Sequence, residues 1–378
     1  MLSDVSRLLR QLVAIPSVNP GFDKAPRAFC GESRIADFLV DWAARLGIRG
    51  ERIEAAPGRD CVLFSIGPES SSVITVSSHL DTVWTAAMGN PFELREDGGY
   101  LYGLGALDDK GPLAAALTAM ARMKDRHLKC RFQVMGTCDE EYGLLGIRRM
   151  IPERCRPSAL IVAEATGMRI IRAHKGSCRF TFRTRGKAVH SSLVPQGENA
   201  ICKAAKIITA LEEYGKGMLA EKGHPLLGTN TLSVGVITGG TQPSFVPDEC
   251  TFIVNFRTLP GDTEERITAR FRDAADAAGA DYEIVDRSFD ASGLDTPENL
   301  PLIKSIQELQ KAFGYDPTPG GLPCATESFR AAQFGIPAIV WGPGAMETAH
   351  TAGERIEVEQ LENYTEMLCQ CMETAGPF

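Results

Sequence analysis

The stretch ITVSSHLDTVWTAAMGNPFELREDGGYLYGLGALDDKGP, residues 74–112, decides how the rest of the chain is interpreted. It begins as an apolar strand that ends in a His-x-Asp pair, His79 and Asp81. After a turn-rich excursion, it passes through a glycine-rich segment to an acidic pair, Asp108 and Asp109. Imidazole and carboxylate groups are common ligands of metal ions. The stretch therefore predicts part of a metal centre, and the remaining ligands must come from elsewhere.

The composition is typical of a globular protein with two domains. The chain has 378 residues, of which 44% are hydrophobic and 23% charged, and this length exceeds one ordinary core. The formal net charge of −8 argues against a nucleic-acid or anionic-membrane partner. The 11 cysteines include no CxxC pair, and the N-terminal residues lack the apolar core of a signal peptide. We therefore expect a cytoplasmic protein with reduced thiols and no membrane span.

Two outer segments, residues 1–173 and 289–378, show strands that alternate with helices. Such alternation predicts an α/β domain with a mixed, largely parallel sheet. In the first segment we expect strands at 73–77, 130–137 and 159–162 and helices at 112–124 and 143–150, the earlier helix with Pro112 at its first position. In the second segment we expect helices at 302–313, 328–334 and 357–374 and a strand at 338–341.

The segment between them, residues 174–288, follows a different pattern. Its predicted order is strand, helix, strand, strand, helix, strand, which is typical of a ferredoxin-like α+β unit. The strands are expected at 177–185, 231–237, 251–257 and 281–285, and the helices at 199–214 and 262–278, with Asp262 as the cap of the latter. We therefore expect one catalytic domain that is interrupted by an inserted domain. His174 lies at the junction and is assigned no role.

Further candidate ligands follow the ends of apolar strands. Glu140 and Glu141 come directly after the predicted strand 130–137, and Glu164 follows the strand 159–162. Because ligands bind at the carboxyl ends of parallel strands, these acids should lie close to His79. His350, which follows a Gly-Pro-Gly loop, should reach the same edge.

Each motif also has an alternative interpretation when it is taken alone. His79 and Asp81 could be an ordinary polar strand end, and acids after a strand could favour a helix N-terminus. Gly103-x-Gly105 resembles the start of a dinucleotide motif, but its third glycine position holds Asp108, whose carboxylate would repel a pyrophosphate. Together the candidates suit two metal ions, because two ions need a bridging carboxylate and act on one water.

The assembled motifs resemble the M20 family of zinc aminoacylases and peptidases, which includes acetylornithine deacetylase, succinyl-diaminopimelate desuccinylase, aminoacylase and glutamate carboxypeptidase. The resemblance runs from IPSVNP at residue 15 through SSHLDTV, GLGALDDKG, DEEYG, AEAT and GKAVHSS to AHTAGE. It implies a zinc-peptidase-like catalytic domain and an inserted lid or dimerisation domain.

The resemblance also implies a role for each candidate ligand. His79 and Glu164 would bind one zinc ion, Glu141 and His350 the other, and Asp108 would bridge them. Asp81 would orient His79, and the Asp108-Asp109 peptide bond would be cis.

The implied reaction is amide hydrolysis with Glu140 as general base. His190, in GKAVHSS, would reach the active site of a partner subunit and stabilise the oxyanion. Arg257 would bind a substrate carboxylate. Thr326 and Glu327 are further substrate-binding candidates, since Glu327 resembles the acetylornithine deacetylase branch.

The expected function is removal of an acyl group from an N-acyl amino acid by two zinc ions per chain, with Co or Mn as substitutes. An M20 dipeptidase or carboxypeptidase is the alternative enzyme, and a binding protein that keeps the fold without activity is the non-enzymatic one. We expect a small-molecule substrate, no nucleic-acid or membrane partner, and a homodimer formed through the inserted domain.

Overall fold

The computed structural model describes residues 2–69 and 72–374, which form two compact units. The first unit runs to Arg172 and resumes over Thr296–Gly320 and from Thr326 onward. The second unit comprises Ala173–Asp295 and Gly321–Ala325. The expected entry into the inserted domain, after residue 173, lies one residue from the observed one. The return comes seven residues later than expected, after residue 295 instead of 288, because strand β12 continues to Ala291.

The first unit contains most of a mixed sheet with the order β1-β2-β6-β3-β7-β15-β8-β13, with β14 paired to β8; by residue number, β13 and parts of β8 and β14 belong to the second unit. The four central strands, β6, β3, β7 and β15, are parallel, and the strands on either side of them are antiparallel. The strands are β1 (Arg49–Ala56), β2 (Arg59–Ile66), β3 (Val73–His79), β6 (Arg131–Thr137), β7 (Ala159–Val162), β8 (Ile171–His174), β13 (Leu294–Asp295), β14 (Gly320–Leu322) and β15 (Ala338–Val340).

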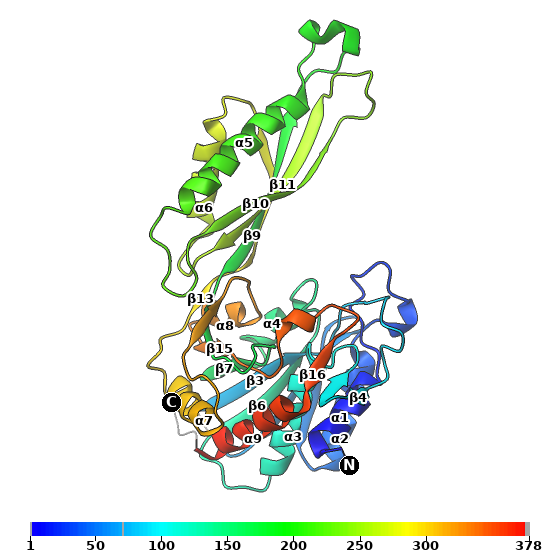
Figure 1. The fold of residues 1–378 in the computed structure, drawn as a ribbon, viewed down its shortest axis with the longest axis vertical. Coiled ribbons are helices and arrows are strands. Elements are labelled where there is room, and N and C mark those ends of the chain that lie inside the picture. Colours follow the sequence, from blue (N-terminus) through cyan, green and yellow to red (C-terminus); the bar gives the residue numbers. More distant parts are fainter. Residues whose placement is uncertain (1, 70–71, 375–378) are drawn as a thin grey trace. The chain divides into compact units, whose positions relative to one another are not determined.

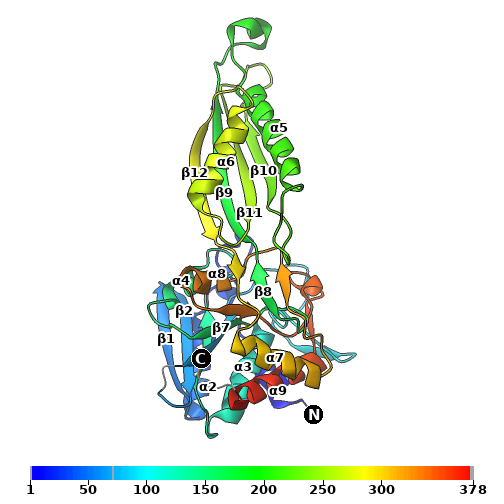
Figure 2. The same cartoon turned by 90° about the vertical axis from the view of Figure 1, so that its left-hand side faces the viewer.

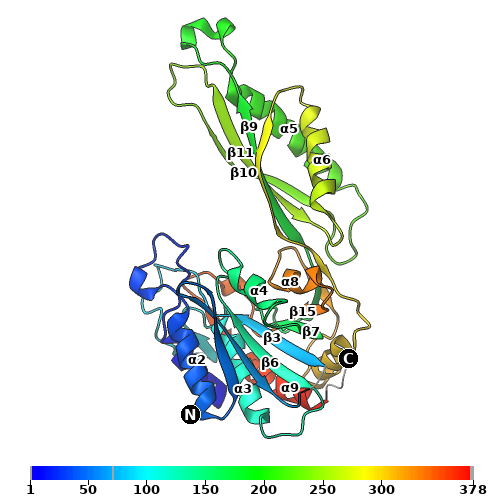
Figure 3. The same cartoon turned by 180° about the vertical axis from the view of Figure 1, so that it is seen from behind.

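One apolar core joins five helices of the first unit to a face of this sheet (Figures 1 and 3). The helices are α1 (Asp4–Val13), α2 (Ser33–Arg45), α3 (Lys110–Met123), α7 (Pro301–Ala312) and α9 (Val358–Thr374). Helix α3 packs against both α1 and α9, and its Ala- and Leu-rich sequence is buried almost throughout. Two shorter helices are α4 (Leu145–Met150) and α8 (Ser328–Gln333).

The second unit has a four-stranded antiparallel sheet with the order β10-β11-β9-β12. Its strands are β9 (Gly176–Arg185), β10 (Thr231–Gly239), β11 (Glu249–Thr258) and β12 (Glu283–Ala291). Helices α5 (Ala200–Met218) and α6 (Glu264–Asp276) lie along the same face of the sheet (Figure 2). The phenylalanines of β9 and β11 alternate toward these helices and form a separate core. This is the expected α+β unit.

Several local features differ from the expectations. Helix α3 begins at Lys110, so Pro112 is its third residue and not its first. Thr263 caps α6 in place of Asp262, whose carboxylate accepts the N–H of Leu259. A small sheet was not predicted; it consists of β4 (Arg95–Asp97), β5 (Tyr100–Tyr102) and β16 (Arg355–Glu357). Among the described helices, none is both long and apolar enough to cross a membrane.

Candidate metal centre

The candidate ligands of the first unit meet where its parallel strands end. His79 is the last residue of β3, Glu140 follows β6, and Glu164 follows β7. Asp108 precedes α3, with its peptide bond to Asp109 in the cis form, as the resemblance implies. This is the edge at which an open α/β sheet places its ligands.

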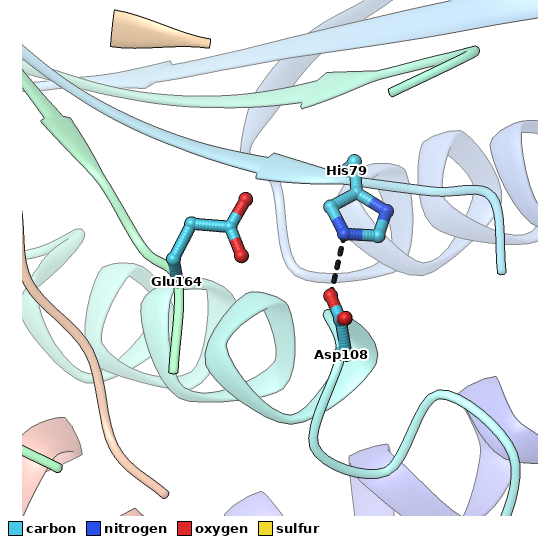
Figure 4. A group of neighbouring side chains, drawn as sticks. All are labelled: His79, Asp108 and Glu164. Atoms are coloured by element: carbon cyan, nitrogen blue, oxygen red, sulfur yellow. Dashed lines mark hydrogen bonds and ion pairs between the residues drawn. The ribbon is translucent and has the colours of Figure 1, made fainter. Parts of the chain in front are cut away.

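The first group of possible ligands consists of His79, Asp108 and Glu164 (Figure 4). One ligand atom from each lies within 4.8 Å of the others. His79 Nε2 is 2.8 Å from Asp108 Oδ1, and all three residues are buried. A histidine and two carboxylates at this spacing match the ligand set that zinc takes in proteins.

The second group consists of Asp108, Glu141 and His350. His350 Nε2 lies 3.1 Å from Asp108 Oδ2 and 3.1 Å from Glu141 Oε1. Asp108 thus belongs to both groups and turns one carboxylate oxygen toward each histidine. A carboxylate that bridges two ions needs this arrangement.

The electrostatics of these residues fit a bound cation. Burial raises the pKa of Glu164 and Glu141, and the charge of Asp108 raises both further. Asp109 Oδ1 is a buried oxygen for which the described residues provide no hydrogen-bond partner. Carboxylates crowded in this way repel one another, and a dication among them would relieve that repulsion.

The histidines respond to the same carboxylates. Hydrogen bonds with Asp108 and Glu141 raise the pKa of His350 to about 10. Burial opposes ionisation of Asp108, but its contacts with His350 and His79 outweigh that effect and lower its pKa. Both imidazoles would have to be neutral to bind a metal, so binding should release protons.

Glu140 lies next to the two groups and, among the described residues, belongs to neither. Its side chain is half-buried. Burial raises its pKa well above the usual value, and the nearby charge of Glu164 raises it further. A carboxylate that is close to a metal site without being a ligand can act as a general base.

The role predicted for Asp81 needs correction in one detail. His79 Nδ1 lies 2.9 Å from the main-chain oxygen of Asp81 and 3.7 Å from its carboxylate. The backbone carbonyl is therefore the closer orienting group. The carboxylate instead accepts the backbone N–H groups of Glu140 at 3.0 Å and Glu141 at 3.2 Å. Asp81 thus fixes the segment that carries the base.

A buried polar network that the sequence did not reveal supports this segment. Asn19 donates to the carboxylates of Asp81, at 2.6 Å, and Asp139, at 3.0 Å. Arg59 donates to Asp139 at 2.9 Å and forms two 2.7 Å bonds to Glu32. Asp139 has a φ of 64°, an uncommon value for a residue other than glycine. The first acid of the Asp-Glu-Glu run, Asp139, is thus paired with Arg59.

A comparison with known protein families identifies the family of this chain. Residues 75–374 match peptidase family M20/M25/M40. The chain belongs to this family. It is therefore a metal-dependent hydrolase.

Relatives of this M20 chain include proteins described as acetylornithine deacetylases. The protein from Myxococcus xanthus is 33% identical over 290 residues, which cover 74% of this chain and 73% of the relative. The protein from Vibrio vulnificus is 28% identical over 386 residues, covering 98% and 97% of the two chains.

Solved structures share the M20 fold over nearly the whole chain. A tripeptidase from Staphylococcus aureus has a TM-score of 0.80 at 23% identity and covers 98% of this chain and 97% of its own. A Bacillus subtilis protein described as a dinuclear metal-binding peptidase of the M20 family has a TM-score of 0.70 at 17% identity, with 98% of each chain covered. At these identities the likeness concerns the fold.

Two substrate-binding candidates of the M20 chain, Thr326 and Glu327, are buried in the first unit. Glu327 is buried, and its Oε2 accepts hydrogen bonds from Thr137 at 2.9 Å and Ser77 at 3.2 Å. Burial raises its pKa to about 7. Thr326 is also buried and lies 2.8 Å from the Ser328 hydroxyl. Glu327 thus connects the ends of β3 and β6. The substrate contacts assigned to Thr326 and Glu327 stay predictions.

The remaining candidates belong to the second unit of the M20 chain. His190 is exposed, its Nδ1 accepts the N–H of Ser192 at 3.2 Å, and its ring lies against Phe245 at 6.5 Å. Arg257 is half-buried near the end of β11, opposite Thr231 of β10. The roles assigned to these two side chains stay predictions.

Proposed function

We propose that this chain hydrolyses the amide bond of an N-acyl amino acid at a pair of zinc ions. The observation that carries the proposal is the meeting of two ligand groups at Asp108, with Glu140 beside them and outside both. The acetylornithine deacetylases among the relatives support the acyl amino acid as the substrate class.

The two groups define which residues would hold the ions. His79 and Glu164 would bind one zinc, Glu141 and His350 the other, and Asp108 both. The bound ions would supply Lewis-acid activation of the scissile carbonyl and of the attacking water.

Glu140 would move the proton in this reaction. Its carboxylate would accept the proton from the attacking water and later deliver it to the nitrogen of the leaving amine. A raised pKa suits both steps, because the same group must first take the proton and then hold it as an acid. Asp81 would keep this carboxylate in place through the backbone N–H of Glu140.

The second unit would recognise the substrate. We propose that the planar guanidinium of Arg257 pairs with the substrate carboxylate. His190 would donate a hydrogen bond to the oxyanion of a partner subunit's reaction, which requires a homodimer.

Replacement of the base tests the mechanism. E140Q should lower kcat by at least about 10²-fold, in line with the contribution of general base catalysis, while the bound zinc per chain stays at the wild-type value. E308Q, which changes an exposed acid on α7, is the matched control and should keep full activity. Wild-type activity in E140Q would contradict the assignment of the base.

A substrate panel distinguishes the proposed activity from its alternatives. Acetylornithine and other N-acyl amino acids should be hydrolysed with a higher kcat/KM than dipeptides, tripeptides or C-terminal peptide bonds. Peptides must be included in the panel because a tripeptidase has the same fold. Faster turnover of peptides would favour the dipeptidase or carboxypeptidase function. Less than one zinc per chain after reconstitution, with no turnover, would favour the inactive binding protein.

A further inference from the structure

Glu354 is a buried acid that no step of the proposed reaction uses. It lies between His350 and strand β16 and is 2% exposed. We propose that Glu354 is the positioning residue that holds Asp108 where it can serve both ligand groups. This inference rests on the metal function proposed above.

The carboxylate of Glu354 accepts three backbone hydrogen bonds from the loop that carries Asp108. Its Oε1 accepts the N–H of Leu107 at 3.0 Å and of Asp108 itself at 3.1 Å. Its Oε2 accepts the N–H of Gly105 at 3.0 Å. The loop can therefore move relative to Glu354 only if it breaks buried hydrogen bonds, which is costly.

The contacts join two distant parts of the chain. Glu354 is four residues after His350, and its backbone oxygen also accepts the N–H of Gly103 at 3.4 Å. The segment that supplies one histidine is thereby fastened to the loop that supplies the shared carboxylate. Groups that hold ligands in this way commonly affect metal affinity 10- to 100-fold.

Only a carboxylate satisfies this arrangement. Three N–H donors converge on its two oxygens, and an amide would turn its NH₂ group toward at least one of them. The turn also leaves little space, since a Cβ on Gly105, at a φ of 76°, would come within 2.8 Å of Thr82. Gly105 therefore has to be a glycine for the loop to keep this conformation.

The test is a zinc titration of E354Q against the wild-type protein, with metal content measured by mass spectrometry. E354Q should bind zinc at least about tenfold more weakly at both sites, because Asp108 belongs to both groups. D262N is the matched control, since Asp262 is a buried acid of the second unit that holds a loop through the Leu259 N–H at 2.8 Å. It should lower the melting temperature without changing zinc affinity.

The outcomes separate the inference from the function on which it rests. Wild-type zinc affinity in folded E354Q would overturn the role of Glu354 and leave the dizinc proposal intact. A wild-type protein that binds no zinc would overturn the dizinc proposal itself. If E354Q does not fold, the same zinc titration is carried out on E354D, because this variant keeps the charge on a shorter side chain. Unchanged affinity in E354D would then contradict the inference, and a loss of about tenfold or more would support it.

Discussion

His174 in the second unit shows how a single buried side chain can make stability depend on pH. The residue is fully buried on β8, and its Nδ1 lies 3.0 Å from the backbone oxygen of Lys175. Burial lowers its pKa from 6.5 to about 4, although the contact with Lys175 opposes the shift. Between these two values the unfolded chain binds a proton that the folded chain does not. The free energy of unfolding should therefore fall as the pH drops from 6.5 to 4.

The size of this effect makes it measurable. A shift of this magnitude corresponds to about 3 kcal/mol, all of it retained above pH 6.5 and lost by pH 4. H174Q should remove most of this dependence, as measured by urea unfolding at several pH values with a chelator present. H127Q, which changes an exposed histidine, should retain it. If the free energy of unfolding of H174Q fell with pH as steeply as that of the wild-type protein, His174 would not be the source of this dependence.

Residue types at the ends of β3, β6 and β7 were sufficient to predict that His79, Glu141 and Glu164 contribute to the two ligand groups, whereas Asp108 and His350 lie on loops. The end of a strand determines where the backbone of a residue lies in the sheet. The residue types His, Asp and Glu then restrict the possible chemistry to metal binding and proton transfer. The supporting residues were not predictable in the same way. Arg59 contacts Asp139 across 80 positions of sequence, and Glu354 contacts Asp108 across 246. Such pairs depend on tertiary contacts that leave no local pattern.

Strand β10 is an edge strand that exposes two adjacent apolar side chains. It pairs with β11 alone in the four-stranded sheet. Val236 and Ile237 on it are 51% and 52% exposed. Unpaired edges of this kind favour pairing with another strand, which is consistent with a homodimer formed through the second unit.

A charge on this edge tests the proposed dimer. I237K should convert a dimer to a monomer in sedimentation velocity, because a lysine on an edge strand opposes pairing with another strand. V285K is the matched control on the opposite edge strand, β12, where Val285 is 37% exposed. It should leave the dimer intact. A dimeric I237K would exclude β10 as the contact, and a monomeric wild-type protein would exclude the dimer.

The longer elements could be predicted because their patterns span many residues. Phe180 and Phe182 alternate with polar residues on β9, and the Ala-rich run of α3 has an apolar composition throughout. The small sheet of β4, β5 and β16 escaped prediction, because three-residue strands contain too few positions for a period. The first residue of α3 depends on the turn at Gly105. The local sequence does not reveal which groups surround the backbone of this turn.

Each unit has a large core of its own, and among the described residues the possible metal ligands belong to the first unit. A ligand that binds only the folded state stabilises it, by about 4 kcal/mol at a thousandfold excess over Kd. Metal removal should therefore destabilise the first unit selectively. The alternation of strands and helices made this two-domain division predictable, but the position of the return at residue 296 was not, since it depends on how far β12 continues.

The three tryptophans, Trp42, Trp84 and Trp341, all lie in the first unit and provide a probe for it. On chelation, the melting temperature followed by tryptophan fluorescence should fall by several degrees, and added zinc should restore it. A transition of the second unit, followed by far-ultraviolet circular dichroism, should stay in place. Equal shifts of both transitions would show that the units unfold together, and no shift in tryptophan fluorescence would argue against metal binding in the first unit.

The position of β15 has a consequence for the order in which the protein matures on the ribosome. This strand lies between β7 and β8 in the sheet, yet it is encoded after the entire second unit. The inserted unit can thus be complete while β7 still lacks its neighbour, and His350 emerges later still. Strand β15 is synthesised more than 150 residues after β7. Until then, the edge of β7 in the nascent first unit stays unpaired. A chaperone that shields such an edge would act during this interval.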